Sequence, residues 1–536
     1  MPPSIEPILV AGSWRAADTS ETFQAVDPTT GNLRDAVWPV STWADVAAAL
    51  DAAVDAAAAL ERVPDAARGD FLDRYAARLE ARAAEIVAAA HAETGLAVRP
   101  RLAAVEYPRM LDQLRQAAAT AREGSWRMPM IDTRNNIRSA ATGLGPVVVF
   151  PPGNFPLAYG AVTGGDFAAA IAAGNPVVAK AHPGCPAVSR LAAKEAQAAL
   201  AETGLPPATV QLLHGISVAD GLRLVADPRV GATGFTGSET AGRALYAAAS
   251  AAGRVIWVEM GSLNPVVFLP GAVAERAATL ADDLTASVTG SAGQFCTKPG
   301  LVFFLADAAA QALVGRLRDA FMALEPQGLL GPGGRDRLVA AVAHLERAGA
   351  RLISESGAPS PRPSPGGRGS RHGGCTHPPT LLEVSGAAFR AGSDPFLVEA
   401  FGNATLLVAC ADLDELLACV SQVRGSLGAS LYAAHDGRDD AVFPRVAAAL
   451  TARAGRIIEN RMPTGLIVTA PMQHGGPWPS AAPPFFSAVG FPFTVLRFAR
   501  RVCFDGWSQP RLPECLRDEP PPSRPWRFVN GAWQRS

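Results

Sequence analysis

The sequence GPVVVF at residues 145–150 decides the fold, together with NPVVAK at 175–180, VQLL at 210–213 and VGATGF at 230–235. Each is a short apolar run rich in β-branched residues, and stretches with helical spacing separate them. Continuous apolar strands are typical of strands that are covered on both faces. Strands of this kind that alternate with helices predict an α/β fold built on a doubly wound parallel sheet.

The same alternation continues on both sides of this stretch. Residues 43–123 are alanine-rich with helical spacing, and Thr94-Gly95 marks a helix end. The helices of the decisive stretch are expected at 161–173, from Pro186 to Gly204 and from 218 to 226. A second alternating region occupies residues 260–455, with strands expected near 301–305, 350–354 and 428–433.

Residues 357–371 interrupt this second region with a run of Pro, Gly, Ser and Arg. Such a composition has no apolar side chains to bury, and it predicts a disordered surface insertion.

Composition excludes several classes of protein. The 536 residues are 49% hydrophobic and 18% charged, with a net charge of −1 and no block of like charges. These values argue against nucleic acid or an anionic membrane as the main partner. The N-terminus lacks the pattern of a signal peptide, and seven cysteines form no disulfide framework, so a reduced, cytoplasmic protein is expected.

Three residues suggest a reaction. Cys296 lies in the uncharged segment GQFCT, and Glu259 follows an apolar strand. A thiol that attacks a carbonyl needs a base, and a nearby carboxylate can serve. Asn154 follows the strand at 147–150, where its amide could stabilise an oxyanion, although a plain turn asparagine is the alternative.

A nucleotide site is suggested at two other strand ends. The Gly-x-Gly-x-x-Gly fingerprint is absent, but a Gly/Ser turn that includes Gly237, Ser238 and Gly242 joins a strand to a helix. Ser238 could bind a diphosphate or only cap the helix. Lys180 ends another strand and suits ribose or phosphate, with a surface lysine as the alternative.

Six motifs occur in the order found in the aldehyde dehydrogenase superfamily, which this chain resembles from residue 12 to about 501. They are NFP at 154–156, GNPVVAK at 174–180, FTGS at 235–238, EMG at 259–261, QFC at 294–296 and EAFG at 399–402. Within that superfamily, KAHP at 180–183, QFC and HGGPWP at 474–479 look most like the 2,5-dioxopentanoate (α-ketoglutaric semialdehyde) dehydrogenase branch.

The resemblance implies a catalytic cycle and a set of roles. Cys296 would be the nucleophile that forms a thiohemiacetal and then a thioester, and Glu259 the base for thiol or water. Asn154 and the Cys296 backbone N–H would hold the oxyanion. Cofactor contacts would come from Lys180, His182, Gly237, Ser238, Gly242, Glu399 and Phe401. No metal is required.

The resemblance also implies the domain plan. Residues 1–259 would form a nucleotide-binding domain with a strand arm near 125–142, and residues 260–455 a catalytic thiol domain. Residues 456–536 would return to the first domain, complete the arm and end in a tail. The arm would join subunits into homodimers or homotetramers.

The cofactor preference is partly readable. Many NAD-preferring relatives carry a glutamate three residues after the lysine, where this chain has Pro183. Lys180 and His182 are the local cations, so NADP is predicted to be accepted and preferred over NAD.

Phe295, His474 and Arg109 are the substrate candidates. A carboxylated semialdehyde needs a cation, which Arg109 could supply from its helix, although a solvated face with an ion pair is the alternative. His474 could instead be a hydrogen-bonded structural histidine.

Several features leave other interpretations open. Pro151-Pro152-Gly153 and Asn403 depart from the family pattern, so a catalytically weak homologue is one alternative. A cysteine-dependent thioesterase or acyltransferase is another. The tract 372–377 superficially resembles a metal cluster, but it lacks a second ligand pair and a zinc site there is not expected.

Overall fold

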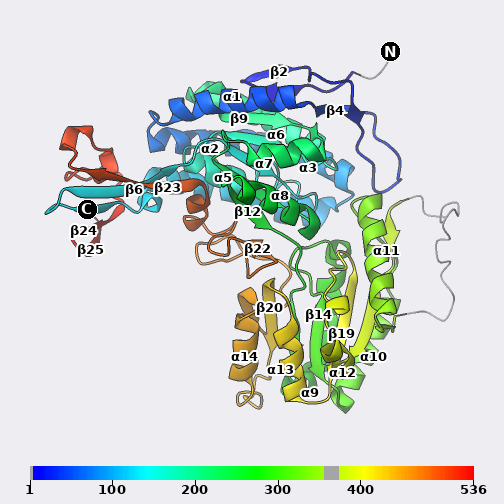
Figure 1. Ribbon diagram of the computed structural model, residues 1–536. Helices are drawn as coiled ribbons and strands as arrows, with labels where there is room; N and C mark the ends of the chain where they lie inside the picture. The colour runs from blue at the N-terminus through cyan, green and yellow to red at the C-terminus, as the bar shows by residue number, and fades with distance from the viewer. Residues whose placement is uncertain (1–3, 355–373, 536) are drawn as a thin grey trace.

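The computed structural model describes residues 4–354 and 374–535. Two α/β units lie one above the other, and a ribbon of strands projects to one side and holds the C-terminus (Figure 1). The insertion predicted at 357–371 lies outside the described residues, as does part of the tract 372–377.

An eight-stranded sheet forms the centre of the upper unit. Its strands, in spatial order, are β2 (Ser13–Arg15), β1 (Ile8–Val10), β9 (Val210–Leu213), β8 (Val177–Lys180), β7 (Val147–Phe150), β11 (Ala232–Thr236), β12 (Val255–Glu259) and β22 (Ala481–Ala482). The five inner strands are parallel, whereas β1, β2 and β22 are antiparallel additions at the two edges.

Helices cover both faces of this sheet, as alternate side chains show. Val147 and Val149 point to one face, which packs against α2 (Asp65–Ala81), α4 (Tyr107–Glu123), α5 (Gly165–Ala172) and α6 (Pro186–Thr203). Val148 points to the other face, covered by α1 (Trp43–Leu60), α7 (Val218–Ala226) and α8 (Glu239–Ala251). The predicted doubly wound sheet is confirmed.

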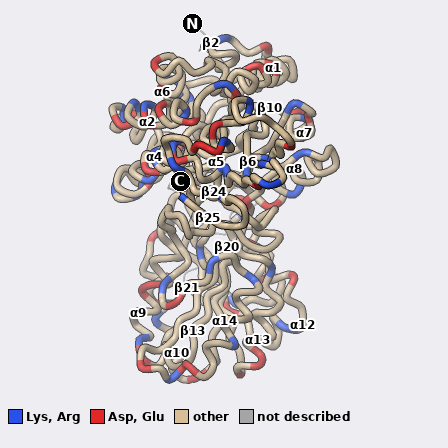
Figure 2. Tube along the Cα trace, turned by 90° about the vertical axis from the view of Figure 1, so that its left-hand side faces the viewer, with Lys and Arg blue, Asp and Glu red and all other residues tan. Residues whose placement is uncertain are grey.

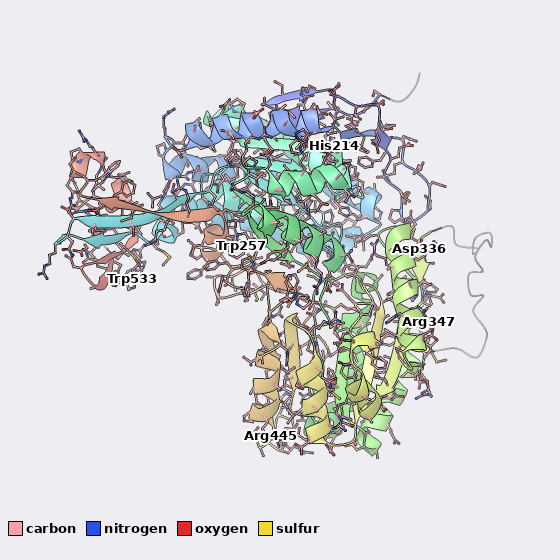
Figure 3. The ribbon with its side chains drawn as sticks, in the orientation of Figure 1. His214, Trp257, Asp336, Arg347, Arg445 and Trp533 are labelled. Atoms are coloured by element: carbon pink, nitrogen blue, oxygen red, sulfur yellow. The ribbon has the colours of Figure 1, made fainter. Side chains whose placement is uncertain are left out.

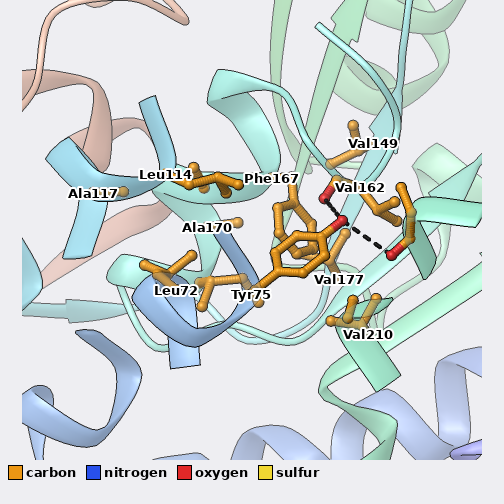
Figure 4. Packing of buried hydrophobic residues seen from close by; sticks show 14 of the residues in the cluster. Leu72, Tyr75, Leu114, Ala117, Val149, Val162, Phe167, Ala170, Val177 and Val210 are labelled. Atoms are coloured by element: carbon orange, nitrogen blue, oxygen red, sulfur yellow. Dashed lines mark hydrogen bonds between the residues drawn. The ribbon is translucent and has the colours of Figure 1, made fainter. Parts of the chain in front are cut away.

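A buried tyrosine hydroxyl makes two hydrogen bonds inside the larger hydrophobic core of the upper unit. Tyr75 of α2 lies against the ring of Phe167, and its OH donates to the carbonyls of Val162 and Ala192 at 3.1 and 3.2 Å (Figure 4). Both acceptors belong to segments that connect or cover the inner strands, so this hydrogen-bonded tyrosine fixes α2 over the sheet.

Two predicted element boundaries are wrong. The helix predicted at 161–173 begins at Gly165, because residues 160–164 form turns in which Thr163 Oγ1 donates to the Leu157 carbonyl at 2.6 Å. The strand predicted at 350–354 is only β16 (Arg351–Leu352). The predicted helix end at Thr94 is confirmed: α3 (Ala83–Thr94) stops at Gly95, whose φ is +66°. A π-helix, η1 (Val98–Glu106), then leads into α4.

A seven-stranded sheet forms the lower unit. Its strands, in spatial order, are β16, β18 (Thr380–Ser385), β19 (Ala404–Cys410), β14 (Leu301–Leu305), β13 (Val266–Phe268), β20 (Ser426–Tyr432) and β21 (Ala454–Glu459). Helices α9 (Pro270–Thr289) and α10 (Ala308–Met322) cover one face. Helices α12 (Gly386–Ala391), α13 (Leu413–Gln422) and α14 (Phe443–Thr451) cover the other, and α11 (Pro332–Arg347) lies beside them.

The projecting ribbon joins segments from distant parts of the chain. It consists of β23 (Ala499–Asp505), β6 (Ile137–Gly143), β5 (Met130–Asp132), β24 (Trp526–Val529) and β25 (Ala532–Arg535). Trp533 lies on this arm (Figure 3). Half of this residue is exposed. The shorter strands are β3 (Thr22–Phe23), β4 (Trp38–Ser41), β10 (Gly215–Ile216), β15 (Gln327–Gly328) and β17 (Thr376–His377). Two parallel-sheet units and an arm match the predicted fold class, while the predicted domain boundaries stay a prediction.

The surface is mixed in charge. Basic and acidic residues are interspersed over the helices of both units (Figure 2). Among the described helices, none is long and apolar enough to cross a membrane. All seven cysteines are free thiols.

Candidate active site

Strand order places a crevice at the carboxyl edge of the upper sheet. From β7 the chain moves outward through β8 and β9, and then crosses to β11 and β12 on the other side of β7. Open parallel sheets bind ligands at such a switch point, outside the carboxyl ends of the strands. Asn154 follows β7, Lys180 ends β8, Ser238 follows β11 and Glu259 ends β12, so four predicted site residues meet at this edge.

The thiol comes to the same crevice from the lower sheet. Cys296 lies just before β14, in a loop that Asn264 holds by donating from Nδ2 to the carbonyls of Cys296 and Lys298 at 2.8 and 3.0 Å. Gly293 in this loop has φ +69°, and a Cβ there would lie 2.2 Å from the Gly402 carbonyl oxygen. Only glycine fits such a conformation and such an approach.

Cys296, His474 and Glu259 form a line. Cys296 Sγ lies 3.2 Å from His474 Nε2, and His474 Nδ1 lies 3.3 Å from Glu259 Oε1 without the alignment of a hydrogen bond. His474 and Glu259 are buried, while Cys296 is partly exposed. The structure therefore brings the predicted nucleophile and base together, with the histidine between them.

Burial keeps this line uncharged near neutral pH. Burial, and then the charge of Asp166, raise the pKa of Glu259 to about 8. Burial, and then the charges of Arg109 and Arg456, lower the pKa of His474 to about 3. Burial and the Glu259 charge raise the pKa of the Cys296 thiol. The arrangement places a neutral thiol beside a neutral imidazole.

A buried ion pair holds the Asn154 loop. Arg101 pairs with Glu106, and its Nη2 donates to the Asn154 carbonyl at 2.8 Å. Glu106 Oε1 accepts from the backbone N–H groups of Leu157 and Ala158 at 2.7 and 3.0 Å. Asn154 is itself buried. Its Nδ2 donates to the Gln294 carbonyl at 2.9 Å, so the amide lies beside the thiol loop.

A cavity of about 810 Å³ opens next to the thiol loop. Phe155 and Phe295 line it from the two units, with their ring centroids 5.7 Å apart. Arg101 and Arg109 also line it, and the Arg101 guanidinium lies 4.1 Å from the centre of the Phe155 ring. Among the described residues Arg109 has no carboxylate partner, and its Nη2 donates to Tyr159 OH at 2.9 Å. The alternative of a solvated ion pair at Arg109 is therefore wrong.

The candidate cofactor residues form an open cradle beside the crevice. Lys180 Nζ has no hydrogen-bond partner among the described residues, and burial lowers its pKa to about 8. Ser238 is exposed and caps α8 by accepting from Ala241 N at 3.4 Å, which leaves its hydroxyl proton free. Gly237 donates from its N–H to the Glu259 carbonyl at 3.0 Å, and a Cβ at Gly242 would lie 2.6 Å from Met260. An unpartnered lysine and an open helix N-terminus fit a dinucleotide.

His182 lies close to Lys180, at the carboxyl edge of the same sheet. Burial, and then the charge of Lys180, lower its pKa to about 3, so it is neutral at physiological pH. The ring instead packs on the Pro151-Pro152-Gly153 turn, where a Cβ at Gly153 would lie 2.5 Å from it. The lowered pKa disfavours a charge on His182, and its role in cofactor binding stays a prediction.

Glu399 and Phe401 reach the crevice from the lower unit. Glu399 Oε1 accepts from the N–H of Ser262 at 3.0 Å, and burial raises the pKa of this carboxyl to about 7. Lys298 is buried beneath it and donates to the carbonyls of Ala400 and Ala404. Phe401 is partly exposed at the end of this segment. A carboxyl group near the end of β12 and a partly exposed ring two residues beyond it fit the nicotinamide end of the same cofactor.

Asn403, which departs from the family pattern, has a structural partner. Its Nδ2 donates to the His377 carbonyl at 2.9 Å, and its Oδ1 lies 3.2 Å from His377 Nδ1. His377 is thereby used in packing the lower sheet. The remainder of the metal-like tract includes residues outside those described.

Comparison with known sequences decides the family. Residues 14–481 match the aldehyde dehydrogenase family. The chain belongs to that family.

Two relatives match nearly the whole chain. It is 37% identical to alpha-ketoglutaric semialdehyde dehydrogenase 2 of Azospirillum brasilense, over 96% of this chain and 97% of the relative. It is 32% identical to alpha-ketoglutaric semialdehyde dehydrogenase of Acinetobacter baylyi, over the same shares of the two chains.

Solved structures share the fold. Aldehyde dehydrogenase C of Pseudomonas syringae, solved with NAD+ and octanal, superposes with a TM-score of 0.78 at 22% identity and covers 94% of this chain and 97% of its own. A putative methylmalonate-semialdehyde dehydrogenase of Sinorhizobium meliloti, solved with NAD, gives 0.79 at 18% identity and covers 94% and 98%. The family match and the two full-length relatives show that this aldehyde dehydrogenase oxidises an aldehyde to a carboxylic acid with NAD or NADP.

Sequence reasoning missed three residues of the site. Arg101, Asn264 and Lys298 each hold a loop that carries a predicted site residue. These three residues differ from the exposed polar residues of the chain only in being buried, and the pattern of charges along the sequence does not reveal burial. His474, predicted near the substrate, lies against the thiol, and its role there stays a prediction.

Replacing Arg101 tests the buried pair. Arg101→Met leaves Glu106 buried without compensation, and we expect a loss of about 3–5 kcal/mol in unfolding free energy. Because the Asn154 loop also loses a donor, kcat/KM is expected to fall about 100-fold. Denaturation and steady-state kinetics measure the two effects.

Two further variants separate stability from positioning. Arg101→Met with Glu106→Gln removes the uncompensated charge and is expected to recover stability while kcat/KM stays low. Arg115→Met breaks the exposed pair with Glu80 and is expected to change stability by less than about 1 kcal/mol. A double variant with wild-type kcat/KM would contradict the positioning role.

Proposed function

We propose that the enzyme oxidises 2,5-dioxopentanoate (α-ketoglutaric semialdehyde) to 2-oxoglutarate through a thioester on Cys296. Support comes from the names of the two full-length relatives and from one observation in the cavity: Arg109 faces it without a carboxylate partner.

Arg109 is the substrate anchor in this proposal. A carboxylate that enters the apolar cavity loses its hydration and needs a charge-assisted partner. Arg101 also lines the cavity, but it is already paired with Glu106. Arg109 can therefore hold the acid end, and Phe155 and Phe295 enclose the chain that leads to the thiol.

The acid–base steps divide between two residues. His474 Nε2 is the nearest acceptor to the thiol, so His474 takes the Cys296 proton as sulfur attacks the aldehyde carbon. Because burial lowers the pKa of His474 to about 3, the imidazole holds this proton only transiently and passes it to solvent. Asn154 Nδ2, now bonded to the Gln294 carbonyl, and the Cys296 backbone N–H would stabilise the oxyanion. Glu259, behind His474, then activates the water that hydrolyses the thioester.

The bound nicotinamide supplies the hydride acceptor that protein side chains lack. Lys180 would bind the adenine ribose region, Ser238 with Gly237 and Gly242 the diphosphate, and Glu399 with Phe401 the nicotinamide ribose and ring. We propose that NADP is preferred, because Pro183 replaces an acidic residue and Lys180 is an unpartnered cation.

The proposal extends to assembly and location. The arm exposes about half of Trp526 and Trp533, and 40% of Ile137, which supports a homodimer or homotetramer formed through it. A reducing cytoplasm remains our expectation from seven free thiols.

A cysteine-dependent thioesterase or acyltransferase is the rival activity. The direct contact between Cys296 and His474 favours it, because this is how cysteine hydrolases activate their thiol. It predicts ester turnover without nicotinamide reduction. A catalytically weak homologue predicts cofactor binding with little turnover of any aldehyde.

The substrate anchor is tested by Arg109→Ala. Loss of the cation is expected to lower kcat/KM for 2,5-dioxopentanoate about 100-fold, because the carboxylate is left unpaired. For pentanal, a plain aldehyde of the same length, kcat/KM should change little. Arg109→Lys should recover part of the loss. Equal effects on the two aldehydes would remove Arg109 from recognition without touching the aldehyde dehydrogenase assignment.

Pre-steady-state kinetics separates the two bases. Glu259→Gln is expected to keep a rapid burst of nicotinamide reduction and to slow the steady state by about 100-fold or more, because thioester hydrolysis loses its base. His474→Asn is expected to slow the burst itself. Cys296→Ser should show no burst. The opposite pattern in the first two variants would exchange the roles of Glu259 and His474.

The cofactor preference is tested with both dinucleotides. We expect a higher kcat/KM with NADP than with NAD, and Lys180→Ala should lower the NADP value more. The measurement uses one aldehyde at saturation. A large preference for NAD would contradict the proposal.

A further inference from the structure

The line Cys296–His474–Glu259 has a property that aldehyde oxidation does not use. One ligand atom from each residue, a thiol sulfur, an imidazole nitrogen and a carboxylate oxygen, lies within 4.8 Å of the other two. Among residues 4–354 and 374–535 this is the one such group of three histidine, cysteine or acidic residues.

Polar atoms of this group lack partners. Both carboxylate oxygens of Glu259 and the Nδ1 of His474 make no hydrogen bond among the described residues. Their side chains are 6% and 2% exposed, respectively. Buried polar atoms are nearly always satisfied, so these atoms point to a ligand between the three side chains.

The donor set indicates which ligand fits. A thiolate, an imidazole and a carboxylate suit Zn²⁺, whereas Mg²⁺ and Ca²⁺ prefer oxygen ligands alone. Zinc bonds of about 2.0–2.3 Å in a tetrahedron place ligand atoms about 3.3–3.8 Å apart. Cys296 Sγ and His474 Nε2 already lie 3.2 Å apart, and the widest pair, which lies within 4.8 Å, needs to close by at most about 1.5 Å.

We propose that Zn²⁺ binds Cys296, His474 and Glu259 and holds the enzyme in a reversibly inhibited state. Binding forms a bond from the metal to sulfur and releases the thiol proton, and any carboxyl proton, to solvent. The metal carries no electrons away and neither oxidises nor reduces the thiol. While zinc is bound, the sulfur lone pair is engaged and cannot attack an aldehyde. Water can fill the fourth position.

Direct binding tests this proposal without an aldehyde. The full-length enzyme, freed of metal with a chelator, is titrated with Zn²⁺ against a zinc-sensitive dye. We expect one zinc per chain. Cys296→Ser, His474→Asn and Glu259→Gln should each weaken binding by about tenfold or more. Mg²⁺ in large excess should not compete. Binding that is unchanged in all three variants, or that is absent, overturns the proposal.

Two further measurements locate the metal and its effect. Co²⁺ in place of zinc should give a thiolate-to-metal charge-transfer band that Cys296→Ser removes. Cys375→Ser, which alters the cysteine beside the metal-like tract, serves as the matched control and should leave zinc binding unchanged. Loss of binding in that variant would place the metal elsewhere and overturn the proposal. Aldehyde oxidation should fall as zinc fills the site and return with EDTA.

Discussion

The site depends on one constraint: the carboxyl edge of one parallel sheet must face the loops that precede the strands of another. β12 ends at Glu259 and the chain then enters β13 of the second sheet, with Asn264 between them. Asn264 binds the thiol loop, so the short connection that carries the base also positions the nucleophile. A displacement of one sheet would separate Cys296 from Glu259 and His474.

Buried charges keep this interface in register. Arg101 and Glu106 fix the Asn154 loop, Arg497 pairs with Asp166 under the crevice, and Lys298 supports the segment of Glu399. Breaking either of the two ion pairs costs unfolding free energy, because removing one partner leaves an uncompensated charge in an apolar surrounding. The reacting line itself contains no such pair, since its carboxyl, imidazole and thiol are neutral near pH 7.

Much of this could be predicted from the sequence. Apolar strands with helical spacers gave the doubly wound sheet, and short ordered motifs gave Cys296, Glu259, Asn154, Lys180 and Ser238. These features are local, so a few adjacent residues reveal them. The family match confirms the aldehyde dehydrogenase assignment.

The remainder depends on contacts between distant residues. His474 lies 178 residues beyond Cys296, and no spacing rule connects them. In the sequence Arg101 and Arg109 look equivalent, yet in the structure Arg101 is paired with Glu106, whereas Arg109 has no carboxylate partner among the described residues. The pKa of His182 is lowered by burial and by the charge of Lys180, and the sequence does not reveal this effect.

The distance along the chain between Cys296 and His474 has a consequence during translation. Cys296 is synthesised 178 residues before His474. Strand β22, which pairs with β12 beside Glu259 at the edge of the upper sheet, follows His474 in the chain. A nascent chain can thus complete most of both sheets before His474 is made. Until then, the Cys296 thiol lacks the Nε2 atom of His474 as its neighbouring proton acceptor. The reactive arrangement is assembled only after residue 474 has been synthesised.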